Sequence, residues 1–221
     1  MSREVKGVLF DLDGVLIDTE PIWERVRRTF AQEHGGGWSG ELQTQMMGVR
    51  TADWSTALSN ITGGKIRPEA AAREVIENLA DAYRQDLPVI DGAVDAVRAL
   101  APRFRLGLAS GSPPALIALT LQLMDLTDCI EVAMSADEVQ HGKPMPDPYL
   151  ELARRLHLDP AVCVAVEDSA NGIRSAAAAG AHVVAIPRGE HRPDSATLRL
   201  AGAVVPSISE LTPELVMSLS E

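Results

Sequence analysis

Cysteine is scarce in this chain, and long hydrophobic runs are missing. The two cysteines, Cys129 and Cys163, do not form a CxxC pair, so we expect reduced and buried thiols. No apolar run approaches the ~20 residues that span a bilayer. The N-terminal stretch MSREVKGVLF also lacks the apolar core of a signal peptide. These absences predict a cytoplasmic protein without a membrane segment.

Positive charge is also in deficit. The chain carries 31 acidic against 20 basic residues, a formal net charge of −11, which argues against nonspecific binding to nucleic acids or anionic membranes. A small anionic ligand is still compatible with this charge, because a local site can reverse the global sign. Nothing in the sequence requires an oligomer, and we expect a monomer.

The fold class follows from the apolar runs that are present. With 221 residues, 46% hydrophobic and 23% charged, the chain is expected to be a soluble globular protein with one large domain, or a core with a modest insert. Short apolar runs, most of them followed by a helix-like stretch, recur at residues 8–10, 106–109, 132–134, 162–166 and 182–186. Their continuous apolar character predicts strands covered on both faces, hence an α/β fold with a doubly wound parallel sheet.

One segment interrupts this alternation of strands and helices. Between residues 18 and 86 only helix-like stretches occur, at 21–34, 40–47, 51–61 and 68–85, and all three tryptophans lie there. Pro21 and Pro68 suit the first turns of two of these helices. We therefore predict an inserted α-helical domain at 18–86, and a core domain formed by residues 1–17 and 87–221.

Ligands of an open α/β sheet bind at the carboxyl ends of the strands, so the polar residues after each apolar run are the candidates for function. The first candidates are Asp11 and Asp13 of DLDG, residues 11–14. They point the same way in an extended segment, and two such close carboxylates repel each other unless a cation lies between them. The pair suits a hard metal ion, or a nucleophile beside a proton carrier. A polar strand end with a turn-forming Asp-Gly is the alternative.

The second group of candidates follows the run at 106–109. Ser110, Gly111 and Ser112 precede a stretch that begins with proline and is predicted to be helical. We expect Ser112 to be the helix N-cap, which leaves the Ser110 hydroxyl and the Gly111 amide free to hold an anion. Capping alone is the alternative.

The third candidate is Lys143 in HGKPMPDP, residues 141–148. Three prolines stiffen this loop and would hold the lysine in a fixed place, where its compact charge suits a phosphate or a position beside Asp11. An exposed turn lysine is the alternative, and Asp147 would either steady Lys143 or begin the next helix.

The fourth pair is Glu167 and Asp168, which follow the run at 162–166. Both are hard oxygen ligands suited to Mg²⁺, directly or through water. Helix capping by Asp168 or Ser169 is the alternative.

Taken together, these four loops hold what a phosphoryl-transfer site needs. Carboxylates can hold a metal, a hydroxyl and an amide can bind phosphate oxygens, and a lysine can balance negative charge.

The same motifs carry a family resemblance. The stretches DLDGV (11–15), SG (110–111), KP (143–144) and EDSANGI (167–173) resemble, in order, the four signature motifs of the haloacid dehalogenase-like superfamily of phosphatases and phosphomutases. The resemblance spans essentially the whole chain, and the helical insert resembles that family's small α-helical cap. DTEPIW (18–23) and MGVR (47–50) are similar to the beta-phosphoglucomutase-like branch, in particular to bacterial phosphatases of 2-deoxyglucose 6-phosphate and hexitol phosphates.

This resemblance implies roles for five residues. Asp11 would attack phosphorus and become an aspartyl phosphate. Asp13 would protonate the leaving alcohol and then take a proton from water. Ser110, the Gly111 amide and Lys143 would hold the phosphoryl oxygens.

The resemblance also implies that Mg²⁺ is the cofactor. Its ligands would be an oxygen of Asp11, the backbone carbonyl of Asp13, and Asp168, with Glu167 binding directly or through water. The expected reaction is Mg²⁺-dependent hydrolysis of small phosphate monoesters, with sugar or sugar-alcohol phosphates as the substrate class.

Candidates for contacting the leaving group come from the insert. They are Glu20, Trp23 and Arg50. For each of them a purely structural role is the alternative. Glu20 would be an acid favoured by the helix dipole, Trp23 a core residue, and Arg50 part of a surface salt bridge.

Hydrolysis competes with several different activities. Asp13 argues against a dehalogenase, which has no second acid there. Beta-phosphoglucomutases carry a cap histidine, whereas the matching position here is Trp23 and His34 lies too far along the same helix. A phosphomutase is therefore the second hypothesis. A receiver-like domain and an inactive phosphate-binding relative are less favoured still.

Overall fold

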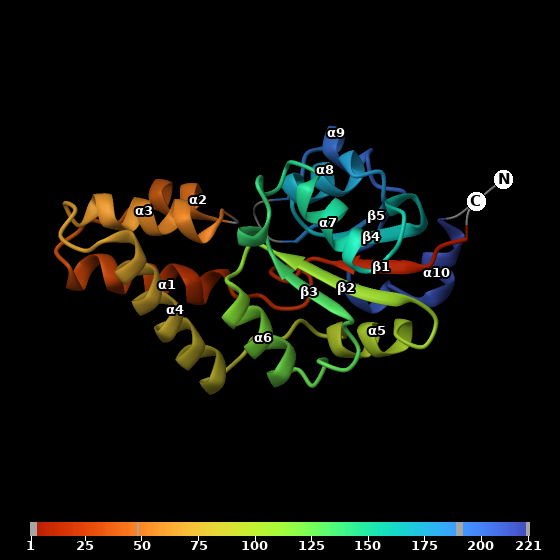
Figure 1. Cartoon of the computed structure of the whole chain (residues 1–221), viewed down its shortest axis with the longest axis horizontal. Coiled ribbons are helices and arrows are strands. Elements are labelled where there is room, and N and C mark those ends of the chain that lie inside the picture. The colour runs from red at the N-terminus through yellow and green to blue at the C-terminus, as the bar shows by residue number, and fades with distance from the viewer. Residues whose placement is uncertain (1–3, 48, 189–191, 220–221) are drawn as a thin grey trace.

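The computed structural model describes residues 4–47, 49–188 and 192–219. Six strands form one sheet in the order β3-β2-β1-β4-β5-β6, and all neighbouring pairs are parallel (Figure 1). The strands are β1 (Gly7–Phe10), β2 (Arg105–Ser110), β3 (Val132–Ser135), β4 (Cys163–Glu167), β5 (His182–Ala185) and β6 (Ala203–Val204). This strand order is that of the Rossmann-like doubly wound fold, with the topological switch point beside β1. The predicted fold class is confirmed.

Each face of the sheet is buried against its own layer of helices, because successive side chains of a strand point to opposite faces. In β4, Val164 and Val166 belong to one apolar cluster, whereas Cys163 and Ala165 belong to the other. The first cluster includes residues of α5 (Ala93–Leu100), α6 (Pro114–Leu123) and α10 (Pro213–Ser218). The second includes residues of α7 (Asp147–Arg155) and α8 (Ala170–Ala178). Short helical turns complete the core: η1 (Ala136–Glu138), η2 (Pro160–Val162), α9 (Ser195–Leu198) and η3 (Ile208–Glu210).

The helical insert lies beside one end of this core (Figure 1). Its helices are α1 (Glu20–Glu33), α2 (Gly40–Met46), α3 (Thr51–Ile61) and α4 (Pro68–Gln85). They enclose a third apolar cluster that includes Trp23, Trp54 and Leu79. Leu116 of α6 belongs to the same cluster, so the packing of the insert continues onto the core. The domain boundaries at 17/18 and 86/87 stay a prediction.

The chain enters and leaves the insert through two segments that lie side by side. The Asp18 amide donates to the Pro88 carbonyl at 2.9 Å, and the Ile90 amide donates to the Leu16 carbonyl at 3.0 Å. An antiparallel bridge between Ile17 and Val89 lies between these two hydrogen bonds. The insert therefore connects to the sheet directly after Asp11 and Asp13.

Most expected elements are confirmed, with small shifts at their ends. Helices α3 and α4 have the expected bounds, and the five expected strands are present. The two-residue edge strand β6 was not predicted. Both cysteines are free; Cys163 is buried as expected, but Cys129 is only partly so. Among the residues described, no helix combines the length and the apolar character needed to cross a membrane.

Two leucines of α7 provide a test of this packing. Leu152 is fully buried in the second cluster, whereas Leu150 of the same helix is 44% exposed. We expect Leu152→Ala to lower the free energy of unfolding by about 2–5 kcal/mol, because it leaves a cavity. Leu150→Ala should change it by roughly 0.5 kcal/mol or less. Urea unfolding of both variants measures the difference, and equal effects would contradict the proposed core.

Candidate active site

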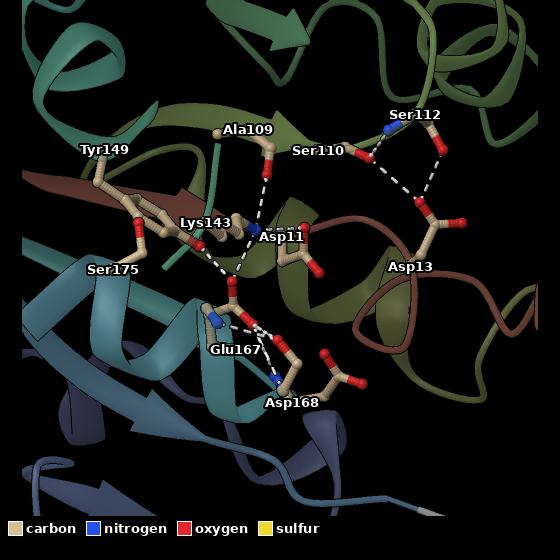
Figure 2. Close-up of polar contacts among 12 residues, drawn as sticks. Asp11, Asp13, Ala109, Ser110, Ser112, Lys143, Tyr149, Glu167, Asp168 and Ser175 are labelled. Atoms are coloured by element: carbon tan, nitrogen blue, oxygen red, sulfur yellow. Dashed lines mark hydrogen bonds and ion pairs between the residues drawn. The ribbon is translucent and has the colours of Figure 1, made fainter. Parts of the chain in front are cut away.

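The four sequence motifs meet at the carboxyl edge of the sheet (Figure 2). Asp11 directly follows β1, Ser110 ends β2, and Glu167 ends β4 with Asp168 next to it. Lys143 comes from the loop between η1 and α7. Because β1 lies between β2 and β4, three strand ends that are far apart in the sequence converge here.

Lys143 is at the centre of the hydrogen-bond network. Its ammonium group lies 2.7 Å from Asp11 Oδ1 and 2.6 Å from Glu167 Oε1, and it donates to the Ala109 carbonyl at 3.2 Å. The lysine side chain is 11% exposed and that of Glu167 is fully buried. Of the two hypotheses for Lys143, the position beside Asp11 is confirmed and the exposed turn is wrong.

Glu167 is held by donors from several elements. Besides Lys143 it accepts from the Tyr149 hydroxyl at 2.7 Å and from the Asp168 amide and the Ser169 hydroxyl, both at 3.2 Å. Gly172 of α8 packs directly against this carboxylate, and a Cβ at that position would overlap it. Because Gly172 has no side chain, the Glu167 carboxylate has room to lie against α8.

Asp13 has a separate set of partners, all of them hydroxyl groups. Its carboxylate accepts from Ser110 at 3.1 Å, from Ser112 at 2.8 Å, and from Thr19 just before α1. The two aspartates therefore differ in their surroundings: Asp11 lies against an ammonium group, and Asp13 against neutral donors. Gly14 has a φ of 90°, which favours glycine. A Cβ at this position would also overlap the Asp168 carboxylate.

The expectation that Ser112 caps the next helix is wrong. The N-cap of α6 is Pro113, which makes no side-chain capping bond, and the Ser112 hydroxyl turns to Asp13 instead. Two other loop assignments are settled in the same way. Asp147 begins α7 and binds His141 rather than Lys143, and Ser169 is the N-cap of α8.

The residues fit a divalent cation. Asp11, Glu167 and Asp168 each offer a carboxylate oxygen, and these oxygens lie within 4.8 Å of one another. Asp168 Oδ1 is buried and has no hydrogen-bond partner among the residues described. A buried carboxylate oxygen without a donor suits a hard cation such as Mg²⁺. The Asp13 side chain lies outside this group; its predicted contribution was the backbone carbonyl.

Burial dominates the electrostatics of the site. It raises the pKa of Asp11 to about 7, although the Lys143 ammonium opposes the shift. The repulsion expected between Asp11 and Asp13 contributes less than burial. Burial and the neighbouring Glu167 and Asp11 also raise the pKa of Asp168 well above its usual value. Lys143 is buried as well, but Asp11 and Glu167 outweigh that effect and hold its pKa well above 10.5.

The candidates from the insert have different surroundings. Trp23 is 5% exposed and packs edge-on against Trp54 with ring centroids 5.8 Å apart, so its role in core packing is confirmed. Glu20 is the first residue of α1 and accepts a hydrogen bond from Gln43 of α2. Burial is the main cause that raises the pKa of Glu20 to about 7.

Arg50 lies where the insert touches the core. Its guanidinium donates to the Gln140 carbonyl at 3.0 Å and lies 3.4 Å from Asp53. The neighbouring Thr51 amide donates to Asp137 of η1 at 3.0 Å. Arg50 therefore contacts the loop that leads to Lys143. Of the stretch 47–50 that carried part of the resemblance, Gly48 lies outside the described residues.

Sequence reasoning missed three polar residues of this site. Thr19 is part of DTEPIW (18–23), but no role of its own was predicted for it. Ser112 was predicted to be a helix N-cap rather than a partner of Asp13. Tyr149 carried no signal, because a tyrosine inside an amphipathic helix is normally read as core.

The fold and the site define a Rossmann-like enzyme core with an acidic, lysine-bearing site at the carboxyl ends of its strands. The chain belongs to the haloacid dehalogenase-like hydrolases, whose family model matches residues 5–180. As an enzyme it is a phosphoric monoester hydrolase.

Individual relatives refine this picture. Hexitol phosphatase B of Escherichia coli strain K12 is 32% identical over 215 residues, covering 95% of this chain and 96% of the relative. Fructose-1-phosphate phosphatase of the same strain is 29% identical over 184 residues, covering 83% and 97%. Beta-phosphoglucomutase from Clostridium difficile has a similar structure, with a TM-score of 0.80 at 22% identity and coverage of 98% and 97%. At that identity the likeness concerns the fold alone.

Glu20 makes the stability of the protein depend on pH. The folded chain keeps the Glu20 proton up to about pH 7, against a carboxyl's ordinary pKa of 4.5. The folded state therefore binds more protons in this window, and the free energy of unfolding falls as the pH rises through it. Arg27 reduces the shift, whereas Asp13 and Glu24 add to it.

We expect Glu20→Gln to lose less stability than the wild type between pH 4.5 and 7.5, by roughly 1–3 kcal/mol. Urea unfolding across this range measures the difference, with Glu33→Gln at the exposed end of α1 as the control. Parallel stability curves for Glu20→Gln and the wild type would contradict the buried position of Glu20.

Proposed function

We propose that this chain is a Mg²⁺-dependent phosphatase that hydrolyses small sugar or sugar-alcohol phosphates through a phosphorylated Asp11. The observation that carries the proposal is the convergence of Asp11, Lys143, Asp168 and Ser110 at one edge of the sheet. The sugar-phosphate names of the relatives reported above support the substrate class.

Asp11 is the proposed nucleophile. Lys143 binds Asp11 Oδ1 at 2.7 Å, and its positive charge favours the ionised carboxylate, which is the form that attacks. In the first step an Asp11 oxygen forms a bond to phosphorus, and the ester bond to the leaving alcohol breaks. In the second step water attacks phosphorus, the bond to Asp11 breaks, and inorganic phosphate leaves.

Asp13 is the proposed proton carrier. It gives its proton to the ester oxygen in the first step and takes a proton from the attacking water in the second, so it ends in its initial state. The hydroxyls of Thr19, Ser110 and Ser112 donate to its carboxylate and hold it in place beside Asp11.

The metal would be held by Asp11, Asp168 and the Asp13 carbonyl. Glu167 is already bound by Lys143 and Tyr149, which supports a contact through water and a role in holding Lys143. When bound, Mg²⁺ supplies positive charge for the phosphoryl oxygens and for the clustered carboxylates.

The phosphoryl group would be bound by neutral and positively charged donors. The proposed donors are the Ser110 hydroxyl, the Gly111 amide and the Lys143 ammonium. Ser110 and Gly111 lie at the end of β2, and Lys143 comes from the loop after η1 and contacts Asp11, so three donors are available for the oxygens of one phosphoryl group.

The insert favours hydrolysis over a mutase reaction. Trp23, at the position expected for a mutase histidine, is buried between Trp54 and the Arg27 guanidinium and has no acid–base group. His34 is bound to Glu74 of α4 at 3.0 Å, at the far end of α1. Neither side chain supports the gating that a mutase needs.

Replacing the nucleophile tests the proposal. We expect Asp11→Asn to lower kcat for hexitol and hexose phosphates by at least about a thousandfold, because an amide cannot form the phosphoryl intermediate. Phosphate release in the presence of Mg²⁺ measures this, with Asp128→Asn, an exposed aspartate before β3, as the control.

Three outcomes would contradict the proposal. Wild-type turnover by Asp11→Asn would exclude this nucleophile. Glucose 6-phosphate formed from beta-glucose 1-phosphate without free phosphate would indicate a mutase. Failure to hydrolyse any ester, together with stable phosphorylation by acetyl phosphate, would indicate a receiver-like role.

Metal removal gives a second test. We expect a chelator to abolish turnover and added Mg²⁺ to restore it. Saturating Mg²⁺, at about a hundred times its Kd, should also stabilise the fold by about 2.7 kcal/mol. Asp168→Asn should weaken both responses, because it removes a carboxylate of the cluster. Full activity in excess chelator would show that the reaction needs no metal.

A further inference from the structure

One face of α1 continues from the active site into the insert. Glu20, Trp23 and Arg27 are spaced at i, i+3 and i+7, so they lie along the same side of the helix. Arg27 is only 3% exposed, which is unusual for a charged side chain. Neither the sequence motifs nor the proposed mechanism uses it.

The Arg27 guanidinium points toward the catalytic end of α1. Its central carbon lies 4.3 Å from the centroid of the Trp23 ring, one turn earlier in the helix, and 5.6 Å from that of Trp54. Helical side chains lean toward the N-terminus, which agrees with this contact. At that end of the helix, Thr19 donates a hydrogen bond to Asp13.

Several buried polar atoms of α1 and α2 have no hydrogen-bond partner among the residues described. These include Nε and Nη1 of Arg27. The same holds for Gln43 Oε1, although the amide nitrogen of Gln43 donates to Glu20. Gln43 is 8% exposed. Buried donors and acceptors are costly to leave unpaired, so these atoms point to a polar partner that the protein does not itself supply.

The unpaired atoms include donors, on Arg27, and an acceptor, on Gln43, and this combination determines which ligand chemistry fits. A hydroxyl group can both accept and donate, so it suits a site with an unpaired donor and an unpaired acceptor, whereas an anion can only accept. The Arg27 charge is also compensated already. Burial lowers its pKa to about 10, while Glu20 and Asp13 favour its charged form. A second phosphate or carboxylate would therefore meet the Asp13 carboxylate, and above about pH 7 that of Glu20, as well as the guanidinium.

We propose that Arg27 and Gln43, together with Glu20, form a subsite that binds hydroxyl groups of the leaving alcohol. The subsite favours uncharged, polyhydroxylated leaving groups over those that lack hydroxyls or carry a carboxylate. The Trp23 ring packs against the Arg27 guanidinium and holds it in position. This inference rests on the proposed phosphatase function and names the residues that select its substrate.

The test compares substrates rather than single rates. We expect Arg27→Met and Gln43→Leu to lower the ratio of kcat/KM for a hexitol 6-phosphate to that for phenyl phosphate by about 10–100-fold. The matched control is Arg28→Met, because Arg28 is the next residue of α1, with a side chain that is 47% exposed and pairs with Glu24. Its ratio should equal that of the wild type.

Two results would overturn the subsite. One is an unchanged ratio in Gln43→Leu, and in Arg27→Met if circular dichroism shows that this variant is folded. The other is a larger loss for phosphoglycolate than for the hexitol ester in Arg27→Met, which would make Arg27 an anion site.

A binding measurement separates this inference from the proposed function. Calorimetric titration of Asp11→Asn with the hexitol 6-phosphate needs no turnover, and adding Arg27→Met should weaken binding about 10–100-fold. If the wild type hydrolyses no ester but this affinity still depends on Arg27, the proposed function fails and the subsite stands. If turnover is present and neither affinity nor ratio depends on Arg27, the subsite alone fails.

Discussion

A buried ammonium group must be paired, and Lys143 is paired by carboxylates from two different strands. Asp11 comes from the end of β1 and Glu167 from the end of β4, and the Tyr149 hydroxyl of α7 donates to the same Glu167 oxygen as Lys143. Removing one partner of such a network costs about 3–5 kcal/mol, because it leaves a buried charge without compensation. The register of the central strands, the loop after β3 and the close packing of α8 at Gly172 all serve this one arrangement.

The second aspartate links the core to the insert. Asp13 is bound by hydroxyls rather than by a cation, and one of them, Thr19, directly precedes α1. Along α1 the surroundings change within two turns from the reacting centre to the buried pair of Arg27 and Trp23. Helix α1 therefore connects Asp13, the proposed proton carrier, to Arg27, which we propose to bind the leaving alcohol. Catalysis and substrate selection would thus depend on the same helix.

Much of the fold could be predicted because burial on both faces leaves continuous apolar runs in the sequence. Five strands followed from such runs, and Pro68 marked the start of α4. The edge strand β6 could not be predicted, since two residues carry no periodic pattern. Ser112 was misassigned because a serine before a proline-led helix suits an N-cap, and only the proximity of Asp13, distant in the sequence, overrides that preference.

The sequence by itself determined which groups stand at the strand ends: Asp11, Asp13, Ser110 and Glu167 follow apolar runs, and parallel strands bring their ends to one edge. Only the tertiary structure decided how these groups are paired. Lys143 lies in a loop with no periodicity, and its partners Asp11 and Glu167 come from strands that are neighbours only through a crossover. The burial of Arg27 was equally out of reach, because arginine is a normal surface residue of a helix and its position depends on the packing of Trp23 and Trp54. Local pattern specifies elements, whereas long-range packing specifies partners.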